Sequence, residues 1–400
     1  MKRLITFFLL TAMVLLLAGC ETPITGADLP DSWVVMPTAN QGVFSEHGYY
    51  YTTPQGILYF LDLTNGGNVA LCSRVDCKHE LETYPEEDCE AFLDILPMSF
   101  QPLFYENEKI YYVASDYYGQ QLYSRNADGT AKTHIATLGK EYYAQQKSIE
   151  IYEYLVVGGM LYYTAEVRGE VHDDLSNYTQ IVREFDVLGR VDLRTGKDEL
   201  LLKGADKVLQ LEAVGGNAVI YLSTAQADYD DPDYAEKLVS TRIMLNLEAG
   251  TSVDLMEKSH SQIGHLIQIE NDQMYVLAND TIIAHDIKTG KSKETVSKVS
   301  EWFKVINAKY AYCHDWEQRL SQIYDIENKA FLPGGIVGMR LRLLNVGKDG
   351  FVVQRPYPKP GGNSTYQEAD YYYLCYCSFA SLSDGFQQSD LIPFSFVDCD

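Results

Sequence analysis

Basic residues are scarce in this chain of 400 residues. Lysine and arginine together number 32 against 56 aspartates and glutamates, which gives a formal net charge of −24 at pH 7. A charge of this sign repels the phosphates of nucleic acid and anionic lipid headgroups. We therefore expect no nucleic acid partner, and we expect the acidic side chains to be spread over a solvated surface.

The motifs of several enzyme classes are also missing. The sequence contains no Gly-x-Ser-x-Gly turn, no P-loop and no glycine fingerprint for dinucleotides. Tryptophan occurs three times without a period, so the Trp-Asp repeat of the commonest propellers is absent as well. These absences leave the question of enzymatic activity open but favour a protein without it.

A single apolar run stands at the N-terminus. Lys2 and Arg3 precede 14 apolar or small residues, Leu4 to Leu17, a run that fits a signal peptide. It falls short of the roughly twenty residues that a membrane span needs. The run ends in Leu17-Ala18-Gly19-Cys20, which resembles a bacterial lipobox. We predict a lipoprotein signal peptide over 1–19, a lipid on Cys20, a tether over 20–31 and an extracytoplasmic, membrane-anchored chain. The alternative is an ordinary secretory signal.

Tyrosine is abundant, with 31 copies that often occur side by side. Tyrosine favours strands and half-buried surfaces, so the composition indicates an all-β protein. Residues 32–400 are expected to form one domain.

A turn that begins with an acid or amide in five clear copies, and ends with glycine in most copies, recurs seven times; the copies that begin at Arg125 and Ser381 are weaker. Its copies lie at 62–66, 125–129, 192–196, 246–250, 286–290, 325–329 and 381–385. The two shortest spacings between successive closing positions, 40 and 39 residues, match one four-stranded propeller blade of about 40 to 45 residues. The repeat predicts a β-propeller of seven four-stranded blades, with six to eight compatible with the spacing. An irregular β-sandwich or two smaller β domains are the alternatives.

The predicted insertions all fall on one face of this propeller. In a propeller the turn between the third and fourth strands lies opposite the connections in which 73–101, 166–178, 226–240 and 355–369 fall. Because loops on a rigid scaffold carry function, we expect 166–178, 226–240 and 355–369 to bind a glycan, peptide or protein ligand. An extracellular polysaccharide-degrading enzyme that uses carboxylates such as Glu166, Glu170, Asp173 and Asp174 is one alternative. An envelope assembly factor, suggested by fold analogy alone, is another.

Acidic side chains crowd the insertion 226–240. Asp228, Asp230, Asp231, Asp233 and Glu236 could supply oxygen ligands, but their spacing is not that of an EF-hand. We therefore do not expect calcium there.

Three cysteines and a histidine cluster in the insertion 73–101 and just before it. Cys72, Cys77, His79 and Cys89 form a Cys3His set, which zinc accepts as a closed structural site. A disulfide from Cys89 to Cys72 or to Cys77 is the competing interpretation, and the sequence leaves both open. If the cluster binds metal, the remaining cysteines, Cys313, Cys375, Cys377 and Cys399, could form two disulfides.

The same segment resembles a known motif. Leu71-Cys72, Cys77-x-His79 and Asp88-Cys89-x-Ala91-Phe92 are similar to a motif near the first repeat of uncharacterised, β-propeller-like lipoproteins of Clostridia and related Firmicutes. The resemblance implies a lipid-anchored propeller and carries over no catalytic residue.

Overall fold

The computed structural model describes residues 42–398 with internal gaps. The gaps are 54–55, 75, 78, 80–88, 94–102, 117–118, 146, 174–177, 204–206, 215–216, 226–237, 247–250, 260–264, 271–272, 279–280, 287–288, 290, 297–303, 307–308, 316, 338–340 and 357–370. Cys20, the signal peptide and the tether therefore lie outside the described residues. Within the described part, no helix is both long enough and apolar enough to cross a bilayer.

The described strands form seven antiparallel sheets, each built from consecutive strands. The first three are β1 Gly42–Phe44, β2 Tyr49–Thr52, β3 Leu58–Leu61 and β4 Asn68–Ala70; β5 Leu103–Glu106, β6 Lys109–Asp116, β7 Gly119–Asn126 and β8 Thr133–Thr137; and β9 Ser148–Val157, β10 Met160–Asp173, β11 Tyr178–Asp192 and β12 Asp198–Lys203. A short helix, α2 Lys140–Tyr143, joins β8 to β9.

The remaining four sheets complete the ring. They are β13 Lys207–Val214, β14 Asn217–Ala225, β15 Leu238–Asn246 and β16 Thr251–Ser259; β17 His265–Glu270, β18 Gln273–Ala278, β19 Thr281–Asp286 and β20 Ser292–Val296; β21 Lys304–Val305, β22 Tyr310–Asp315, β23 Leu320–Asp325, β24 Ala330–Phe331 and β25 Ile336–Val337; and β26 Arg342–Val346, β27 Gly350–Pro356, β28 Tyr371–Ser378 and β29 Ile392–Asp398. Both β24 and β25 pair with β23.

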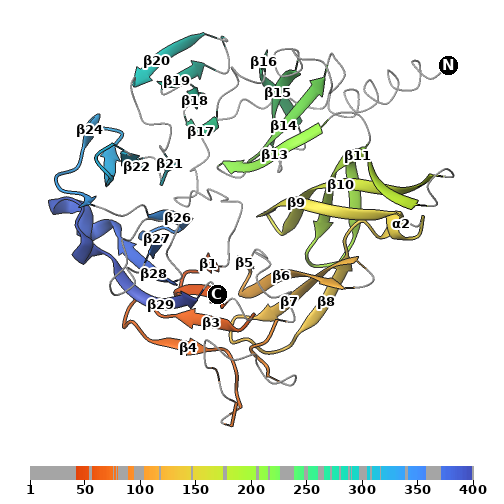
Figure 1. Cartoon of the computed structure of the whole chain (residues 1–400), viewed down its shortest axis with the longest axis horizontal. Helices are drawn as coiled ribbons and strands as arrows, with labels where there is room; N and C mark the ends of the chain where they lie inside the picture. Colours follow the sequence, from red (N-terminus) through yellow and green to blue (C-terminus); the bar gives the residue numbers. More distant parts are fainter. Residues whose placement is uncertain are drawn as a thin grey trace.

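The sheets stand around a ring, with the first strand of each towards the centre and the fourth towards the rim (Figure 1). The predicted all-β propeller is thereby confirmed, and the number of sheets lies within the six to eight that the repeat allowed.

The tyrosine pairs follow from this arrangement. Successive side chains of a strand point to opposite faces of its sheet, and a blade has a neighbouring blade on each face. Tyr50 packs with the second blade, whereas Tyr49 and Tyr51 pack with the last blade. Tyr112 faces the first blade and Tyr111 the third. Adjacent tyrosines therefore fill two inter-blade cores at once.

All seven copies of the recurring turn lie between the third and fourth strands of a sheet. The acid begins the turn as expected: Asp192 Oδ1 accepts the N–H of Arg194 at 2.8 Å and that of Thr195 at 2.9 Å. The last copy departs from the prediction of a short turn. Residues 379–391 contain two 3-10 helices, and Phe386 pairs with the backbone of Pro333 and Gly335 in the preceding blade. The extra length is used to pack against that blade.

Glycine closes the turn for two reasons. Gly129 and Gly196 have φ of +84° and +71°, in the left-handed region. Both also press against the preceding blade. A Cβ on Gly129 would lie 2.7 Å from the carbonyl oxygen of Leu71, and one on Gly196 would collide with the carbonyl oxygen of Ile135. In these two copies the recurring turn is thus a joint between blades.

The ring closes between the first and last blades by side-chain contacts. The Asn68 amide donates to the carbonyl of Phe394 at 2.8 Å, and the Asn345 amide donates to that of Gly42. The Phe394 ring lies edge-on to Tyr49 and Tyr51, with centroids 5.9 and 5.3 Å apart.

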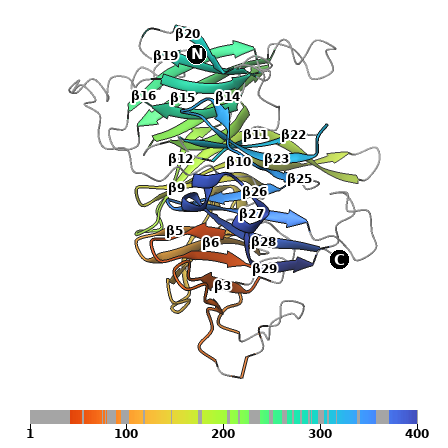
Figure 2. The same ribbon diagram turned by 90° about the vertical axis from the view of Figure 1, so that its left-hand side faces the viewer.

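The chain enters and leaves the ring on the same face. Gly42, where β1 begins, pairs with Tyr51 near the end of β2, at the edge from which the connections between second and third strands depart. Asp398, where β29 ends, pairs with Tyr371, which begins β28 at that edge. Figure 2 shows β29 and the C-terminus pointing to this side of the ring.

The prediction of loops on this face was partly wrong. Residues 166–173 are not a loop but continue β10, which pairs with β11 as far as Asp173 opposite Tyr178. Val167 and Val171 alternate with polar residues, and this alternation extends the strand. Residues 226–237 and 357–369 of the other two predicted ligand loops lie outside the described residues.

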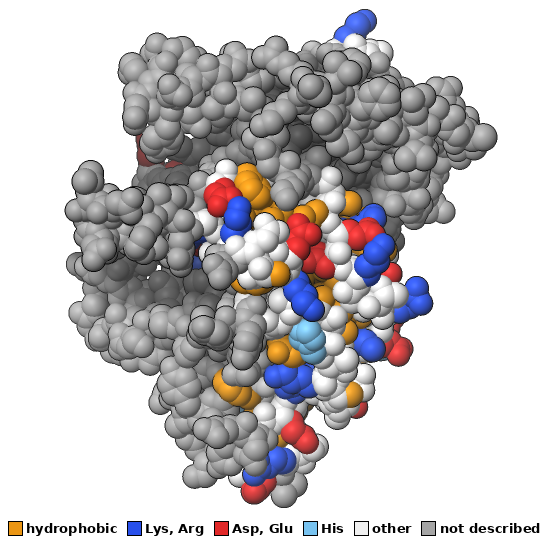
Figure 3. All heavy atoms as spheres, turned by 90° about the vertical axis from the view of Figure 1, so that its right-hand side faces the viewer, with side chains coloured by type: hydrophobic (Ala, Val, Ile, Leu, Met, Phe, Trp, Pro, Cys, Tyr) orange, Lys and Arg blue, Asp and Glu red, His pale blue; other side chains and the backbone are white. Residues whose placement is uncertain are grey.

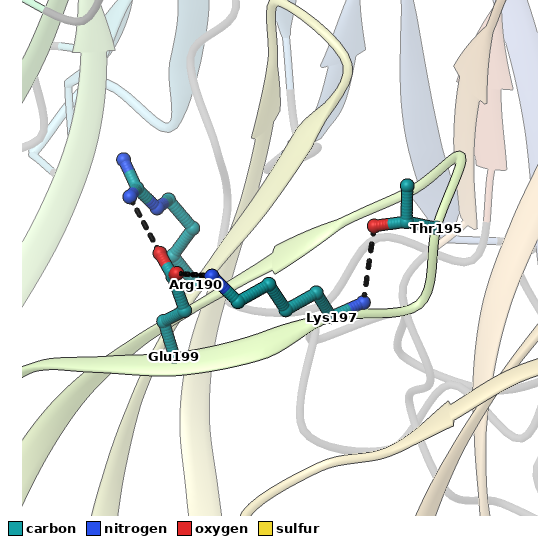
Figure 4. Close-up of polar contacts among 4 residues, drawn as sticks. All are labelled: Arg190, Thr195, Lys197 and Glu199. Atoms are coloured by element: carbon teal, nitrogen blue, oxygen red, sulfur yellow. Dashed lines mark hydrogen bonds and ion pairs between the residues drawn. The ribbon is translucent and has the colours of Figure 1, made fainter.

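Charges on the rim are of both signs. The face in Figure 3 shows acidic and basic side chains intermingled, without a large patch of one sign among the described residues. On the third blade, Glu199 accepts from Arg190 at 2.6 Å and pairs with Lys197 (Figure 4). The hydrogen bonds from Lys197 and Arg190 lower the pKa of Glu199 to about 2. These pairs fasten the outer strand β12 to β11.

The joint can be tested with two glycine substitutions that share a backbone conformation. Gly66 has φ +74°, but a Cβ there would meet nothing within 4 Å. We expect Gly66→Ala to cost about 1 kcal/mol of unfolding free energy from backbone strain alone. Gly196→Ala adds the collision with Ile135 and should cost about 3 kcal/mol. Urea denaturation measures both free energies of unfolding. Equal losses would contradict the conclusion that the turn at Gly196 contacts the preceding blade.

Candidate metal centre

The cysteine cluster lies in the connection between the first and second blades. Cys72 follows β4 by two residues, and the chain returns to the same sheet at residues 89–93. There the carbonyl of Ala91 accepts the N–H of Leu58 at 2.9 Å, and the N–H of Leu93 donates to Gly56 at 3.0 Å. The N–H of Leu71 also donates to the carbonyl of Leu58 at 3.0 Å, so the connection is fixed to the start of β3 at residues on both sides of 80–88.

The structure brings together all four predicted ligand residues. One ligand atom from each of Cys72, Cys77, His79 and Cys89 lies within 4.8 Å of the others. Cys89 is buried, and the other three are half-buried. All three thiols are free, so neither of the loop disulfides considered from the sequence is formed in this structure. The arrangement could hold a metal ion.

The pKa values of Cys72 and Cys77 are shifted in opposite directions. Burial opposes ionisation of Cys72, but the N–H groups of Arg74, Glu90 and Ala91 and the Cys77 thiol outweigh it, and the pKa of Cys72 is lowered. Burial, together with neighbouring Cys89 and Cys72, raises the pKa of Cys77 to about 12. Three thiolates in so small a space repel each other, and a bound cation reverses that penalty.

His79 completes the set. Its Nε2 is buried and has no hydrogen-bond partner among the described residues. An orphaned ring nitrogen beside three thiols fits a metal ligand, because a buried polar atom otherwise needs a partner. The hydroxyl of Tyr59 donates to the backbone carbonyl of His79 at 2.7 Å and so holds this part of the connection against β3.

The chemistry of this set is structural. Four protein ligands fill a tetrahedral coordination sphere and leave no position for a substrate. Thiolate and imidazole donors suit soft or borderline cations such as zinc and disfavour calcium and magnesium.

The other cysteines do not form the two disulfides considered from the sequence. Cys313, Cys375 and Cys377 form no disulfide and are buried in apolar clusters, and Cys399 lies outside the described residues. Burial raises the pKa of Cys375 to about 11 and that of Cys377 to about 12. These thiols act as small apolar side chains of the inter-blade cores.

The carboxylates proposed for an enzyme are not gathered into a site among the described side chains. Glu166 is buried and accepts from Arg168 Nε at 2.7 Å, so it is an ion-pair partner. The side chains of Glu170 and Asp173 lie outside the description, as do Asp174 and all the acids of 226–237. His314 is buried, and its Nδ1 lies 3.1 Å from Ser321 Oγ.

Comparisons with known proteins add little to this geometry. No protein-family model matches the chain, and no curated protein sequence does. A solved nidogen/laminin complex contains a chain that is 10% identical, with a TM-score of 0.37 over 72% of this chain and 92% of that one. A puromycin-hydrolysing peptidase of Mycobacterium tuberculosis is 11% identical, with a TM-score of 0.49 over 92% of this chain and 54% of that one. Both likenesses are too weak to carry an argument about function. The sheets and the cluster themselves define the class: a β-propeller with a Cys3His cluster.

The sequence does not predict the hydrogen bond from Tyr59 to His79, because nothing distinguishes Tyr59 from the other tyrosines among the 31. Its role can be tested against a matched neighbour. Tyr59→Phe removes the hydrogen bond to His79 and should weaken metal binding about tenfold, as is typical of groups that orient ligands. Tyr51→Phe removes a hydrogen bond to Asn68 in the same sheet and should leave the affinity unchanged. Competition with a chromophoric zinc chelator measures both, and equal affinities would contradict the role of Tyr59.

Proposed function

We propose that this chain is a lipid-anchored, extracytoplasmic β-propeller that binds a glycan, peptide or protein partner through the face that bears its long connections. The observation that carries the proposal is the asymmetry between its two faces. The turns between first and second strands are short, whereas the connections at 71–102, 226–237 and 357–370 all leave from the opposite edge. A rigid ring with elaborated loops on one face is the usual design of a binding scaffold.

We further propose that Cys72, Cys77, His79 and Cys89 bind one structural Zn²⁺ on that face. The four ligand atoms within 4.8 Å and the orphaned Nε2 of His79 support this proposal. The metal would supply the order that residues 73–101 need if they are to hold one conformation at the binding face.

The zinc proposal predicts one equivalent of zinc per purified chain. Cys77→Ala and His79→Ala should reduce this to background, because each removes one of four ligands. Cys313→Ala, which changes a thiol of another inter-blade core, is the matched control and should retain the metal. Elemental analysis after removal of loosely bound ions decides; a zinc-free wild type with a disulfide in this segment by mass spectrometry refutes the proposal.

The anchor and the binding face require separate experiments. Wild-type chain should float with membranes and carry a diacylglycerol on Cys20 by mass spectrometry, whereas Cys20→Ser should stay in the soluble fraction. Flotation of Cys20→Ser with membranes would contradict the anchor.

Binding can be measured with the full chain on glycan arrays and by cross-linking on cells. A variant with 226–237 replaced by Asn-Asp, the two residues that connect the second and third strands of the next blade, should lose at least tenfold in affinity for the ligand found. Lys291→Ala, on the short-turn face, is the control and should bind as the wild type does. Turnover of a bound polysaccharide would favour the enzyme instead, and an equal loss in both variants would contradict the assignment of the face.

A further inference from the structure

Arg125 is a buried cation that donates hydrogen bonds to residues 71–93, the part of the first connection that carries the cysteine cluster and is called the cysteine segment below. It lies near the end of β7 in the second blade and is 6% exposed. Its guanidinium donates to the carbonyls of Phe92 at 2.9 Å, Gly129 at 3.0 Å and Glu90. Two of these three acceptors belong to the cysteine segment of the first blade, and Glu90 is adjacent to Cys89.

The two blades also meet through backbone here. Gly129, in the recurring turn of the second blade, leaves no room for a Cβ against Leu71, which immediately precedes Cys72. Glu90 fixes the two ends of the segment to each other, since its carboxylate accepts from the N–H of Ser73 at 2.9 Å and from its hydroxyl at 2.6 Å. The residues that seat the second blade are therefore neighbours in sequence of Cys72 and Cys89.

We propose that metal occupancy at the Cys3His centre controls the joint between the first and second blades. Arg125 is the positioning residue that links the metal centre to this joint. The inference rests on the zinc site proposed above and adds a consequence of its occupancy. With the metal bound, Cys72 and Cys89 hold Leu71 and Glu90 where the turn at 126–129 and Arg125 need them. Without it, the segment loosens and the buried guanidinium loses two of three acceptors, a state that a buried charge disfavours.

The same linkage runs in the reverse direction. A group that stabilises the metal-bound arrangement must raise metal affinity by the factor by which the metal stabilises the joint. Removing the donors of Arg125 should therefore weaken zinc binding, although Arg125 is not a ligand.

Hydrogen exchange of the wild-type full chain, with and without zinc, is the first test. Zinc should slow exchange at least tenfold at Ala127 and Gly129, whose backbone N–H groups donate to the carbonyls of Glu108 and Asn126 respectively. It should leave Leu193 and Gly196, the equivalent amides of the third blade, unchanged. If the chain binds no zinc, the site proposal fails; if it binds zinc and the two blades respond alike, only the coupling fails.

Substitution at Arg125 gives the second test. Arg125→Met keeps an unbranched, apolar stem and removes the donors, and zinc affinity by chelator competition should fall about tenfold. Arg190→Met is the matched control, because Arg190 lies before the equivalent turn in β11 and pairs with Glu199 instead. It should keep the wild-type affinity. Unchanged affinity in Arg125→Met overturns the linkage, and if that variant does not fold, the exchange measurement on the wild type still decides.

Discussion

The close approach of the recurring turn to the blade before it, at Gly129 and Gly196, is the contact on which the joints of the second and third blades depend. At Gly129 and Gly196 the turn comes so near to the backbone of Leu71 and Ile135 that a methyl group would not fit. A propeller blade cannot bury its faces alone, and stacking buries them only if neighbouring sheets keep a fixed separation and twist. The turn sets that separation through backbone contact, and the adjacent tyrosines fill the space that it leaves.

Three of the described joints carry polar contacts of their own. Between the second and third blades, Asp198 accepts the N–H of Gly139 at 2.8 Å and the hydroxyl of Tyr163 at 3.0 Å, and burial raises the pKa of its carboxyl. Between the last and first blades the amides of Asn68 and Asn345 serve this purpose. Buried polar groups are costly unless paired, so these contacts are satisfied only when the two blades are in register. The joint between the first and second blades differs because its polar acceptors lie on a long connection that carries the cysteine cluster.

Much of this could be predicted from the sequence, and the reasons why the rest could not are physical. The turns repeat because each is a local structure in which an acid such as Asp192 caps N–H groups two and three residues later, and local structure leaves a pattern. The cysteine cluster was visible because its four ligands lie within 18 residues of sequence, from Cys72 to Cys89. Arg125 and Tyr59 were not, since their partners are carbonyl oxygens, which every residue has. The prediction of a loop at 166–173 is wrong because pairing with β11, which the spacing of the turns does not reveal, extends β10 through these residues.

A metal at the first joint would solve a problem that the other described joints do not have. The connection that leaves β4 spans residues 71–102, far longer than the ten residues that join β8 to β9, where α2 and Gly139 fold back locally. A long connection costs little extra closure entropy, but the ordering of its residues must be offset by contacts. Four ligands and one ion provide such contacts without a hydrophobic core. Bound by Cys72 and Cys89, the neighbours in sequence of Leu71 and Glu90, the ion would order the acceptors that Arg125 requires. The same site would then serve both the binding face and the stability of the ring.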